Sequence, residues 1–389
     1  MKREDLRRYS LSLGHLCSDV NQGTLAALLP FLIAAYHFDY TTAATLVMVS
    51  NIAGSVIQPV FGLLADKKSR PWLMLLGVCA AGFGMAATGL VSSFAGLCAA
   101  VVVSGMGIAM FHPQAAMIVN AVSTDDNRAT NLGVFSFGGS MGFSLGPAMA
   151  GASIAAFGLR GTLVFLLPPV VFAIAYFSLF AGQTEALAPK RKGGEGAASG
   201  ADDWPGFITL SGLVFSRSIV SSGINTFTVL YLTAVLGQSK GLSSAALSVY
   251  YALSAFLSLL GGRVADKLGH RRAVRLSFAI LMPALALFSM ARASWQALLL
   301  LAPMSLGTSL CFSPMVALGQ RYLPQHVGLA SGMTLGMAVS VGGIVAPLLG
   351  KVGDVWGLRA TFAVIATFAL VPVALSLILH EPGAKKAGA

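Results

Sequence analysis

Long apolar runs, interrupted by short turns that contain charged residues, Gly or Pro, recur along the whole chain. They predict twelve segments, each long enough for an α-helix to cross a bilayer core about 30 Å thick. The predicted ranges are 9–36, 41–64, 71–91, 94–119, 129–156, 160–182, 205–236, 242–264, 271–291, 294–317, 327–353 and 358–380. Backbone groups in lipid must form hydrogen bonds within their own segment, so each run predicts a helix. The alternating segments of about ten residues that mark a membrane β-barrel do not occur in the sequence.

The composition supports a membrane protein. Hydrophobic residues make up 56% of the 389 residues and charged residues only 10%, against roughly 25% charged residues in soluble domains. These values exclude an ordinary soluble enzyme, a disordered protein and a secreted disulfide scaffold. The net charge of +11 does not indicate a nucleic-acid binder, because so apolar a chain cannot gather its cations on one soluble face. Cys17, Cys79, Cys98 and Cys311 lie in apolar runs without paired spacing, which predicts packing residues rather than a metal or redox site.

The charges of the turns predict the orientation in the membrane. One set of turns, together with both termini, holds Lys2, Arg3, Arg7, Arg8, Lys67, Lys68, Arg70, Arg128, Lys190, Arg191, Lys192, Arg263, Lys267, Arg271, Arg272, Arg275, Arg321, Lys385 and Lys386. The opposite set holds only Arg160, Lys240, Arg292, Lys351 and Arg359. Because cytoplasmic loops carry the excess of Lys and Arg, both termini are predicted to be cytoplasmic. A bacterial inner membrane and an even number of spans follow, and no cleavable signal peptide is expected.

An internal repeat divides the chain. The stretch 183–204 is polar, Gly-rich and charged, which predicts a flexible cytoplasmic linker between 1–182 and 205–389. Four motifs of the first part recur about 200 positions later: Gly62–Lys67 as Gly262–Lys267, Phe111–Pro113 as Phe312–Pro314, Gly146–Pro147 as Ala346–Pro347, and Gly158–Thr162 as Gly357–Thr361. The sequence therefore predicts two pseudo-symmetric six-helix bundles. Such repeats allow alternating access, with the substrate site at the interface of the halves.

The turn after 41–64 reads Gly62-x-x-x-Asp66-Lys67-x-x-Arg70, and its repeat contains Asp266 and Arg271. With twelve helices and the repeat, this resembles the loop signature of the major facilitator superfamily. The resemblance covers the whole chain and implies the all-α major facilitator fold. It also implies that these residues latch the outward-facing state. A basic cytoplasmic turn without a latch is the alternative.

The segment 129–156 has Gly at positions 138, 142 and 146, followed by Pro147. Its motif is similar to the Gly-Pro signature of drug/proton antiporters, with Ala150 in place of one Gly. Small residues at this spacing let helices approach closely, and Pro147 is expected to bend the segment. Gly142, Gly146 and Pro147 are therefore candidate hinge residues, with tight packing alone as the alternative.

A closer resemblance is to the fosmidomycin-resistance branch of drug exporters. It rests on His15-Leu-x-x-Asp19-x-x-Gln22, Gln58-Pro59, Phe111-His112-Pro113, Leu323-Pro324 and Gly328-x-x-Ser331-Gly332. In that branch, Phe-His-Pro is often followed by Glu and, three residues later, by Arg. Here these positions are Gln114 and Met117. The missing charged pair weakens the case for a phosphonate substrate.

Charges at membrane depth give the sharpest functional signal. Asp19 is the only acidic residue well inside a predicted span, and Arg217 the only basic one. At 1.5 Å per residue, Asp19 lies roughly 15 Å deep, Arg217 roughly 18 Å and His112 roughly 13 Å. Ionisable groups at such depth are costly and usually functional. Their three helices line the central cavity in the superfamily.

These residues suggest a division of roles. Asp19 is the predicted proton acceptor, and His15, one helical turn away, or His112 is predicted to share the proton. Arg217 is predicted to bind an anionic substrate or to pair with Asp19 when the site is empty. It begins a polar stripe that continues through Ser221, Asn225 and Thr228. The other candidate substrate residues are Gln22, Asn51, Gln58, Gln114, Asn225 and Tyr251.

Structural roles remain open for the same residues. Asp19 and Arg217 can form a fixed pair, and His112 can hydrogen-bond a carbonyl that Pro113 leaves free. His15 can be an interfacial anchor. Gln58, Asn51 and Gln114 can join helices, and Tyr251 can belong to the core or the interfacial aromatic belt.

The predicted function is proton-coupled export of small organic molecules or drugs, with proton-coupled uptake of a small organic anion as the alternative. The proton gradient is the expected energy source, without a cofactor or a metal. The expected partners are a small-molecule substrate, protons and the lipid bilayer, and a monomer is expected. An enzyme or sensor is disfavoured, because no His-Glu-x-x-His motif and no large soluble domain occur.

Overall fold

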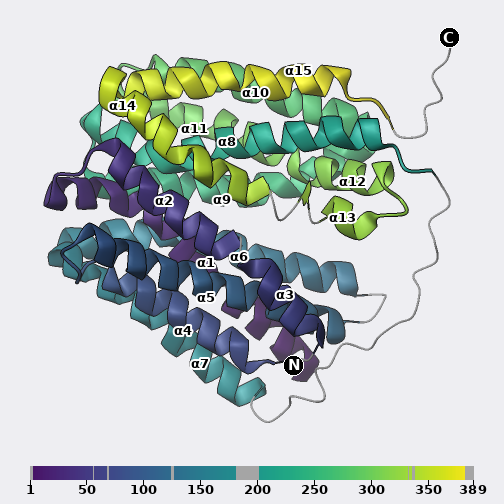
Figure 1. Ribbon diagram of the computed structural model, residues 1–389, viewed down its shortest axis with the longest axis horizontal. Coiled ribbons are helices and arrows are strands. Elements are labelled where there is room, and N and C mark those ends of the chain that lie inside the picture. Colours follow the sequence, from purple (N-terminus) through teal and green to yellow (C-terminus); the bar gives the residue numbers. More distant parts are fainter. Residues whose placement is uncertain are drawn as a thin grey trace. The chain divides into compact units, whose positions relative to one another are not determined.

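In the computed structural model, the described residues are 3–55, 57–67, 70–123, 127–180, 201–331, 333–334 and 338–381. Their regular structure is entirely helical (Figure 1). The predicted linker 183–204 lies outside the described residues except for 201–204. The helices fall into two compact units, which are Met1–Arg191 with Ser239–Ala252, and Lys192–Gln238 with Leu253–Ala389. The organisation into two six-helix bundles joined by a linker stays a prediction.

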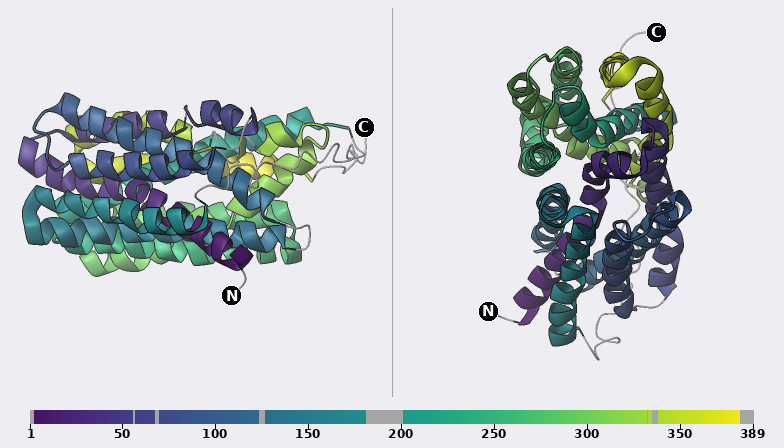
Figure 2. Two further views of the ribbon diagram at one scale, coloured as in Figure 1. Left: turned by 90° about the horizontal axis from the view of Figure 1, so that it is seen from below. Right: turned by 90° about the vertical axis from the view of Figure 1, so that its left-hand side faces the viewer.

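The helices follow one another in the order of the predicted segments. The first part of the chain contains α1 (Arg3–Tyr36), α2 (Tyr40–Ser55), α3 (Gln58–Lys67), α4 (Trp72–Ala87), α5 (Phe94–Ala121), α6 (Arg128–Phe157), the 3₁₀-helix η1 (Gly158–Leu166) and α7 (Leu167–Leu179). The second part contains α8 (Trp204–Ala234), α9 (Lys240–Leu268), α10 (His270–Ser289), α11 (Ser294–Ser309), α12 (Phe312–Tyr322), α13 (Val327–Ser331), α14 (Ala338–Phe368) and α15 (Leu370–Ile378). The two views of Figure 2 show that the long helices within each unit run side by side.

Several segments predicted as continuous helices are interrupted, two of them just before a proline. The segment 41–64 is divided between α2 and α3, and 294–317 is divided between α11 and α12. Pro59 and Pro314 stand just inside the helices that follow these breaks. A proline ring clashes with the carbonyl four residues earlier and cannot donate the helical hydrogen bond, which accounts for both breaks. The predicted segment 327–353 is also divided, between α13 and α14, and residues 335–337 lie outside the described part.

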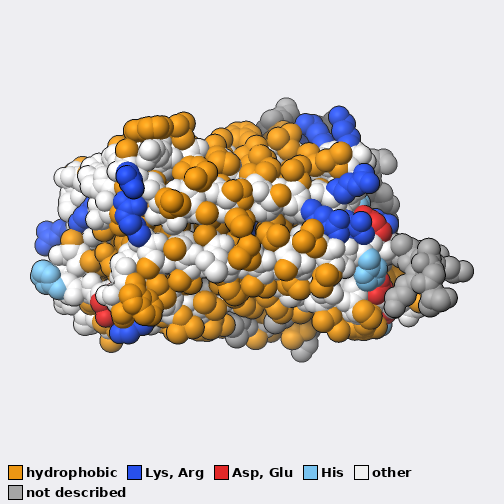
Figure 3. Space-filling model, turned by 90° about the horizontal axis from the view of Figure 1, so that it is seen from above, with side chains coloured by type: hydrophobic (Ala, Val, Ile, Leu, Met, Phe, Trp, Pro, Cys, Tyr) orange, Lys and Arg blue, Asp and Glu red, His pale blue; other side chains and the backbone are white. Residues whose placement is uncertain are grey.

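Nine helical stretches in the described part are long and apolar enough to cross a membrane. Two of them, Thr130–Leu179 and Val341–Ile378, run through a sharp change of backbone direction at Gly158 and Gly357. The shorter apolar helix α4 adds a further candidate span. On the face drawn in Figure 3, hydrophobic side chains cover the middle, while Lys and Arg gather toward the two ends. This surface suits a multi-pass membrane protein.

The structure makes the repeat visible at its Gly-Leu-Arg motifs. Gly158 has φ 62° and ψ −159°, and Gly357 has φ 81° and ψ 162°, a backbone region essentially reserved for glycine. After Gly158, the Thr162 hydroxyl donates to the carbonyl of Ala86 near the end of α4 (2.8 Å). After Gly357, Arg359 Nη1 donates to the carbonyl of Ala291 just beyond α10 (2.7 Å). In both units the motif reverses the chain and satisfies a carbonyl at another helix end.

Gly158→Ala is expected to destabilise the protein by about 1–3 kcal/mol, because a Cβ is strained at that φ and ψ. The measurement is the melting temperature of the purified protein in detergent. Gly133→Ala in α6 is the matched control, since a Cβ there meets nothing within 4 Å. Equal melting temperatures for the two variants would show that the turn at Gly158 relaxes without cost.

Close packing of α1 on α6 determines the geometry of the first unit. Gly138, Gly142 and Gly146 each face the backbone of α1, and an added Cβ at any of them would overlap it. Phe111 of α5 and Phe172 of α7 are fully buried in the same core. The predicted series of small residues therefore serves close packing, whether or not it also serves as a hinge.

Candidate functional site

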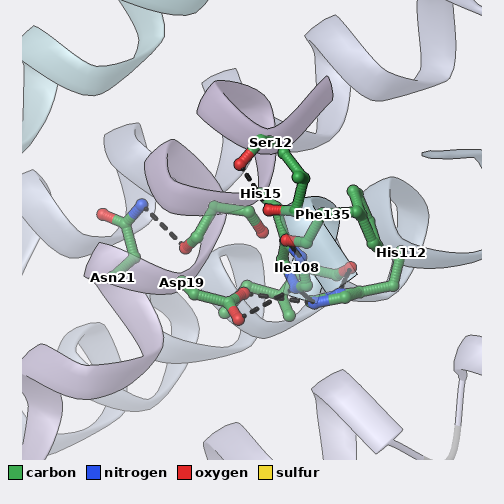
Figure 4. A network of polar contacts seen from close by, with 9 residues as sticks. Ser12, His15, Asp19, Asn21, Ile108, His112 and Phe135 are labelled. Atoms are coloured by element: carbon green, nitrogen blue, oxygen red, sulfur yellow. Dashed lines mark hydrogen bonds and ion pairs between the residues drawn. The ribbon is translucent and has the colours of Figure 1, made fainter. Parts of the chain in front are cut away.

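Three ionisable side chains meet between α1 and α5 in the first unit (Figure 4). Asp19 Oδ2 lies 3.2 Å from His15 Nε2, and Asp19 Oδ1 lies 3.1 Å from His112 Nε2. The two Nε2 atoms are 3.2 Å apart. Asp19 is only 4% exposed. The structure thus brings together the three residues predicted to handle the proton, and we call them the carboxylate–histidine cluster.

Backbone carbonyls determine which ring nitrogens of the cluster carry hydrogen. His15 Nδ1 donates to the carbonyl of Phe135 (2.8 Å), and His112 Nδ1 donates to that of Ile108 (2.9 Å). A carbonyl oxygen only accepts, so both Nδ1 atoms are protonated and both Nε2 atoms of neutral rings present lone pairs. Two lone pairs and a carboxylate at these distances repel one another unless a proton or another cation lies among them. The geometry therefore suits a site that holds and shares a proton.

The structure gives His112 a backbone carbonyl partner, although not the carbonyl that Pro113 frees, and its role in sharing the proton stays a prediction. His112 bonds a backbone carbonyl and also contacts Asp19. That carbonyl belongs to Ile108, whereas the helical partner that Pro113 leaves free is the carbonyl of Ala109. The hydrogen-bond acceptors of the two histidines, Ile108 and Phe135, could not be predicted from the sequence, because they act through main-chain oxygens that any residue type supplies.

The cluster is also the group of described residues that could hold a metal ion. His15, Asp19 and His112 each offer one ligand atom, and these atoms lie within 4.8 Å of one another. Two imidazoles and a carboxylate form a ligand set that transition metals accept. Measurements of proton binding at this site therefore include a chelator.

Arg217 of α8 lies at the interruption between α11 and α12 in the second unit. Its Nε and Nη2 donate to the carbonyl of Thr308, at 3.2 and 2.8 Å, and its guanidinium lies 5.6 Å from the centre of the Phe312 ring. Because α11 ends at Ser309, this carbonyl belongs to a helix C-terminus, which attracts a cation. No described carboxylate forms an ion pair with Arg217, although Ser221 Oγ and Asn225 Oδ1 on the same stripe are buried without hydrogen-bond partners.

The other predicted substrate residues differ in their burial and in their contacts. Gln114 is buried and its Oε1 accepts from the backbone amide of Arg70 (3.1 Å), so it joins α5 to the turn before α4. Tyr251 packs edge-on against Phe143 and Tyr250, with ring centres 5.5 and 5.6 Å away. Partly buried positions are taken by Gln22, Asn51, Gln58 and Asn225. A role for any of them in substrate binding stays a prediction.

The predicted latch is described only in part. The side chains of Asp66 and Lys67 lie outside the described part of the chain. Gly62 faces open space, since a Cβ there would meet nothing within 4 Å. Asp266 is exposed and Arg271 partly buried. The latch therefore stays a prediction.

The candidate hinge lies where α6 contacts α1 and the N-terminal half of α9, which belongs to the first unit. Gly142 and Gly146 face α1, and α6 continues through Pro147 without a break. One residue later, the amide of Ala148 donates to Ser248 Oγ of α9 (2.8 Å), and Ser144 Oγ donates to the carbonyl of Ser248 (3.0 Å). A movement of α6 would therefore act on both neighbours.

Comparison with known proteins adds independent evidence. The sequence profile described as Major Facilitator Superfamily matches residues 11–332 and 210–389. The chain is 25% identical over 370 residues to a protein named "Fosmidomycin resistance protein" from Escherichia coli (strain K12), covering 93% of this chain and 90% of that protein. It is 28% identical to "Multidrug resistance protein MdtG" from Dickeya zeae (strain Ech586), with 83% and 80% covered.

Among solved structures, a bacterial homologue of the human lysosomal transporter Spinster, in an inward-facing and unoccupied conformation, has a TM-score of 0.79 at 15% identity. The match covers 97% of each chain. The predicted all-α membrane fold and the predicted family resemblance are confirmed.

Proposed function

The chain belongs to the Major Facilitator Superfamily, and on that premise we propose that it exports small organic molecules in exchange for protons by alternating access. A multi-pass membrane transporter rather than an enzyme is established by the family and the fold. The proton coupling, the outward direction and the drug-like substrates are the proposal. We place the protein in a bacterial inner membrane with both termini in the cytoplasm.

The carboxylate–histidine cluster is the observation that carries the proposal. Asp19 is nearly inaccessible and two imidazole nitrogens contact its two oxygens, so its charge depends on protons held within the cluster. In the proposed cycle, the cluster takes up a proton when it is open to the periplasm, and the affinity for substrate falls. When it opens to the cytoplasm, Asp19 releases the proton and substrate binds. The change in affinity links the two fluxes.

Export is favoured by the names of two relatives, which refer to resistance, and by the Gly-Pro motif of α6. Candidate substrates can be found by measuring the melting temperature of the purified protein with antibiotics, phosphonates, siderophores and organic acids. A compound that binds the folded state raises that temperature by mass action.

With a binder in hand, membrane vesicles test the direction. Inverted vesicles energised to be acidic inside are expected to accumulate the compound, because their interior corresponds to the periplasm. Right-side-out vesicles with an imposed inward proton gradient are expected to accumulate none beyond vesicles without the protein. Accumulation only in the right-side-out vesicles would overturn export.

Uptake of an organic anion together with a proton is the second candidate function. It is favoured by Arg217, whose described contacts are a neutral carbonyl and an aromatic ring. A cation in this position can accept an anionic substrate from either side of the membrane. Accumulation only in the right-side-out vesicles would favour this function.

A further inference from the structure

We propose that α6 senses the protonation state of the carboxylate–histidine cluster, with Phe135 and Gly139 as the positioning residues that hold His15 against Asp19. This inference rests on the proposed function, because it gives the route by which a proton would move a helix. It assigns roles to two α6 residues that the sequence analysis left without one, and it concerns contacts within the first unit only.

Phe135 holds His15 in two ways. Its carbonyl accepts the hydrogen bond from His15 Nδ1 (2.8 Å), and its ring stacks on the imidazole with centres 4.1 Å apart and planes 25° apart. The hydrogen bond sets the tautomer, and the stacking sets the plane of the ring. Together they direct Nε2 of His15 toward Asp19. Both contacts come from one residue of α6, so the orientation of His15 depends on where α6 lies.

Gly139 lies one helical turn further along and bounds the cluster on the same side. A Cβ at this position would lie 2.5 Å from His15 Nε2 and 2.8 Å from Asp19 Oδ2. Only glycine lets the backbone of α6 approach both atoms. The neighbouring Gly138 serves a different contact, since its Cβ would meet Ser12 of α1. Gly139 is therefore the α6 position that faces the two groups between which the proton is shared.

Loss of the proton would change the forces on α6. Without a shared proton, the lone pair of His15 Nε2 faces the Asp19 carboxylate at 3.2 Å and the lone pair of His112 Nε2 at 3.2 Å. The His15 ring must then turn or shift. It lies against Phe135 and Gly139, so its movement displaces α6 or breaks the stacked contact.

The same helix carries the contact with α9 through Ser144 and Ala148. These residues lie one to three turns beyond Gly139. A displacement that begins at Phe135 and Gly139 would therefore reach the candidate hinge residues and the α9 contact along one rigid element. Proton binding by the cluster and the position of α6 are thus coupled, so that a change in either one shifts the other.

Proton binding by the purified full-length protein, in nanodiscs with a chelator and without substrate, provides the test. Infrared difference spectra recorded against pH follow the carboxyl band of Asp19, which is identified by its loss in Asp19→Asn. Hydrogen–deuterium exchange follows the backbone amides of 140–157. In the wild type, the exchange of this segment is expected to change with the same midpoint pH as the carboxyl band.

Gly139→Ala is expected to move both midpoints together by about one pH unit, equivalent to a tenfold change in proton affinity. Gly133→Ala, in the same helix with open space around it, is expected to move neither. Unshifted midpoints in Gly139→Ala, or an exchange midpoint in the wild type that does not follow the carboxyl band, would overturn the inference.

A double-mutant cycle separates positioning from simple packing. In a His15→Ala background, which leaves the new methyl group only its contact with Asp19 Oδ2, Gly139→Ala is expected to cause a clearly smaller shift than in the wild type. An equal shift in both backgrounds would show that Gly139 acts without His15. Phe135→Leu keeps the main-chain carbonyl and removes the stacking ring, and it replaces Gly139→Ala if that variant does not fold. Phe135→Leu is expected to shift both midpoints by less than one pH unit. Unchanged midpoints in Phe135→Leu would overturn the role of Phe135. These experiments measure no transport. They therefore test the role of α6 even if the proposal of proton-coupled export is wrong.

Discussion

Asp19→Asn protein in liposomes is expected to lose substrate-driven proton movement entirely while remaining folded. An amide has nearly the shape of a carboxylate but cannot take up a proton, so the cluster would keep its size and lose its titratable charge. The measurement is the change in internal pH after addition of the compound identified by thermal stabilisation, compared with liposomes without protein.

Asp354→Asn is the matched control, since it removes an exposed carboxylate from α14 and is expected to leave the coupling unchanged. Retention of the melting temperature by Asp19→Asn would separate the loss of coupling from unfolding. Coupling by Asp19→Asn at the wild-type rate would show that another group carries the proton.

Arg217→Gln is expected to weaken the binding of anionic compounds by about tenfold to about 100-fold, the range for loss of a hydrogen bond to a charged group. Neutral compounds should bind with unchanged affinity. Arg217→Lys is expected to recover part of the loss, because it keeps the charge but not the planar group that bonds Thr308 through two nitrogens. Calorimetric titration of the purified protein measures both effects.

Arg263→Gln, which removes an exposed cation of α9, is the control for a general change in charge. Equal affinity of Arg217→Gln and the wild type for every anionic binder would restrict Arg217 to a structural role at the end of α11. That role would appear as a lower melting temperature, because the variant removes the two hydrogen bonds from the guanidinium of Arg217 to the carbonyl of Thr308.

Two residues of the carboxylate–histidine cluster were identified from the sequence by their expected depth in the membrane. His15 and Asp19 are one turn apart on α1 by spacing alone, and the depth estimate placed His112 at a similar level. Their contacts in the structure join one helix pair of the first unit. This much follows from helical periodicity and from the cost of burying charge.

The orientation of the histidines could not be predicted in the same way. It depends on the main-chain carbonyls of Phe135 and Ile108, and their direction is set by how α1, α5 and α6 pack. Gly139 was visible as one glycine among several in α6. Only the packed structure shows that it faces the cluster while Gly138 faces Ser12.

Prolines explain two of the interruptions within the predicted helical segments. Pro59 and Pro314 follow breaks, whereas α5 and α6 continue through Pro113 and Pro147. Residue type alone does not separate these cases, because neighbouring helices decide whether the freed carbonyl finds another partner. The break before Pro314 leaves the Thr308 carbonyl at a helix end where Arg217 contacts it.

Proton movement by the wild-type protein tests the central proposal most directly. Liposomes containing a pH-sensitive dye, a chelator and the purified protein are given the identified compound from outside, without a membrane potential. Exchange of compound for protons predicts that the interior becomes alkaline as the compound enters, and that a proton carrier abolishes the signal. An interior that becomes acidic, or that keeps its pH while the compound enters, would contradict the account.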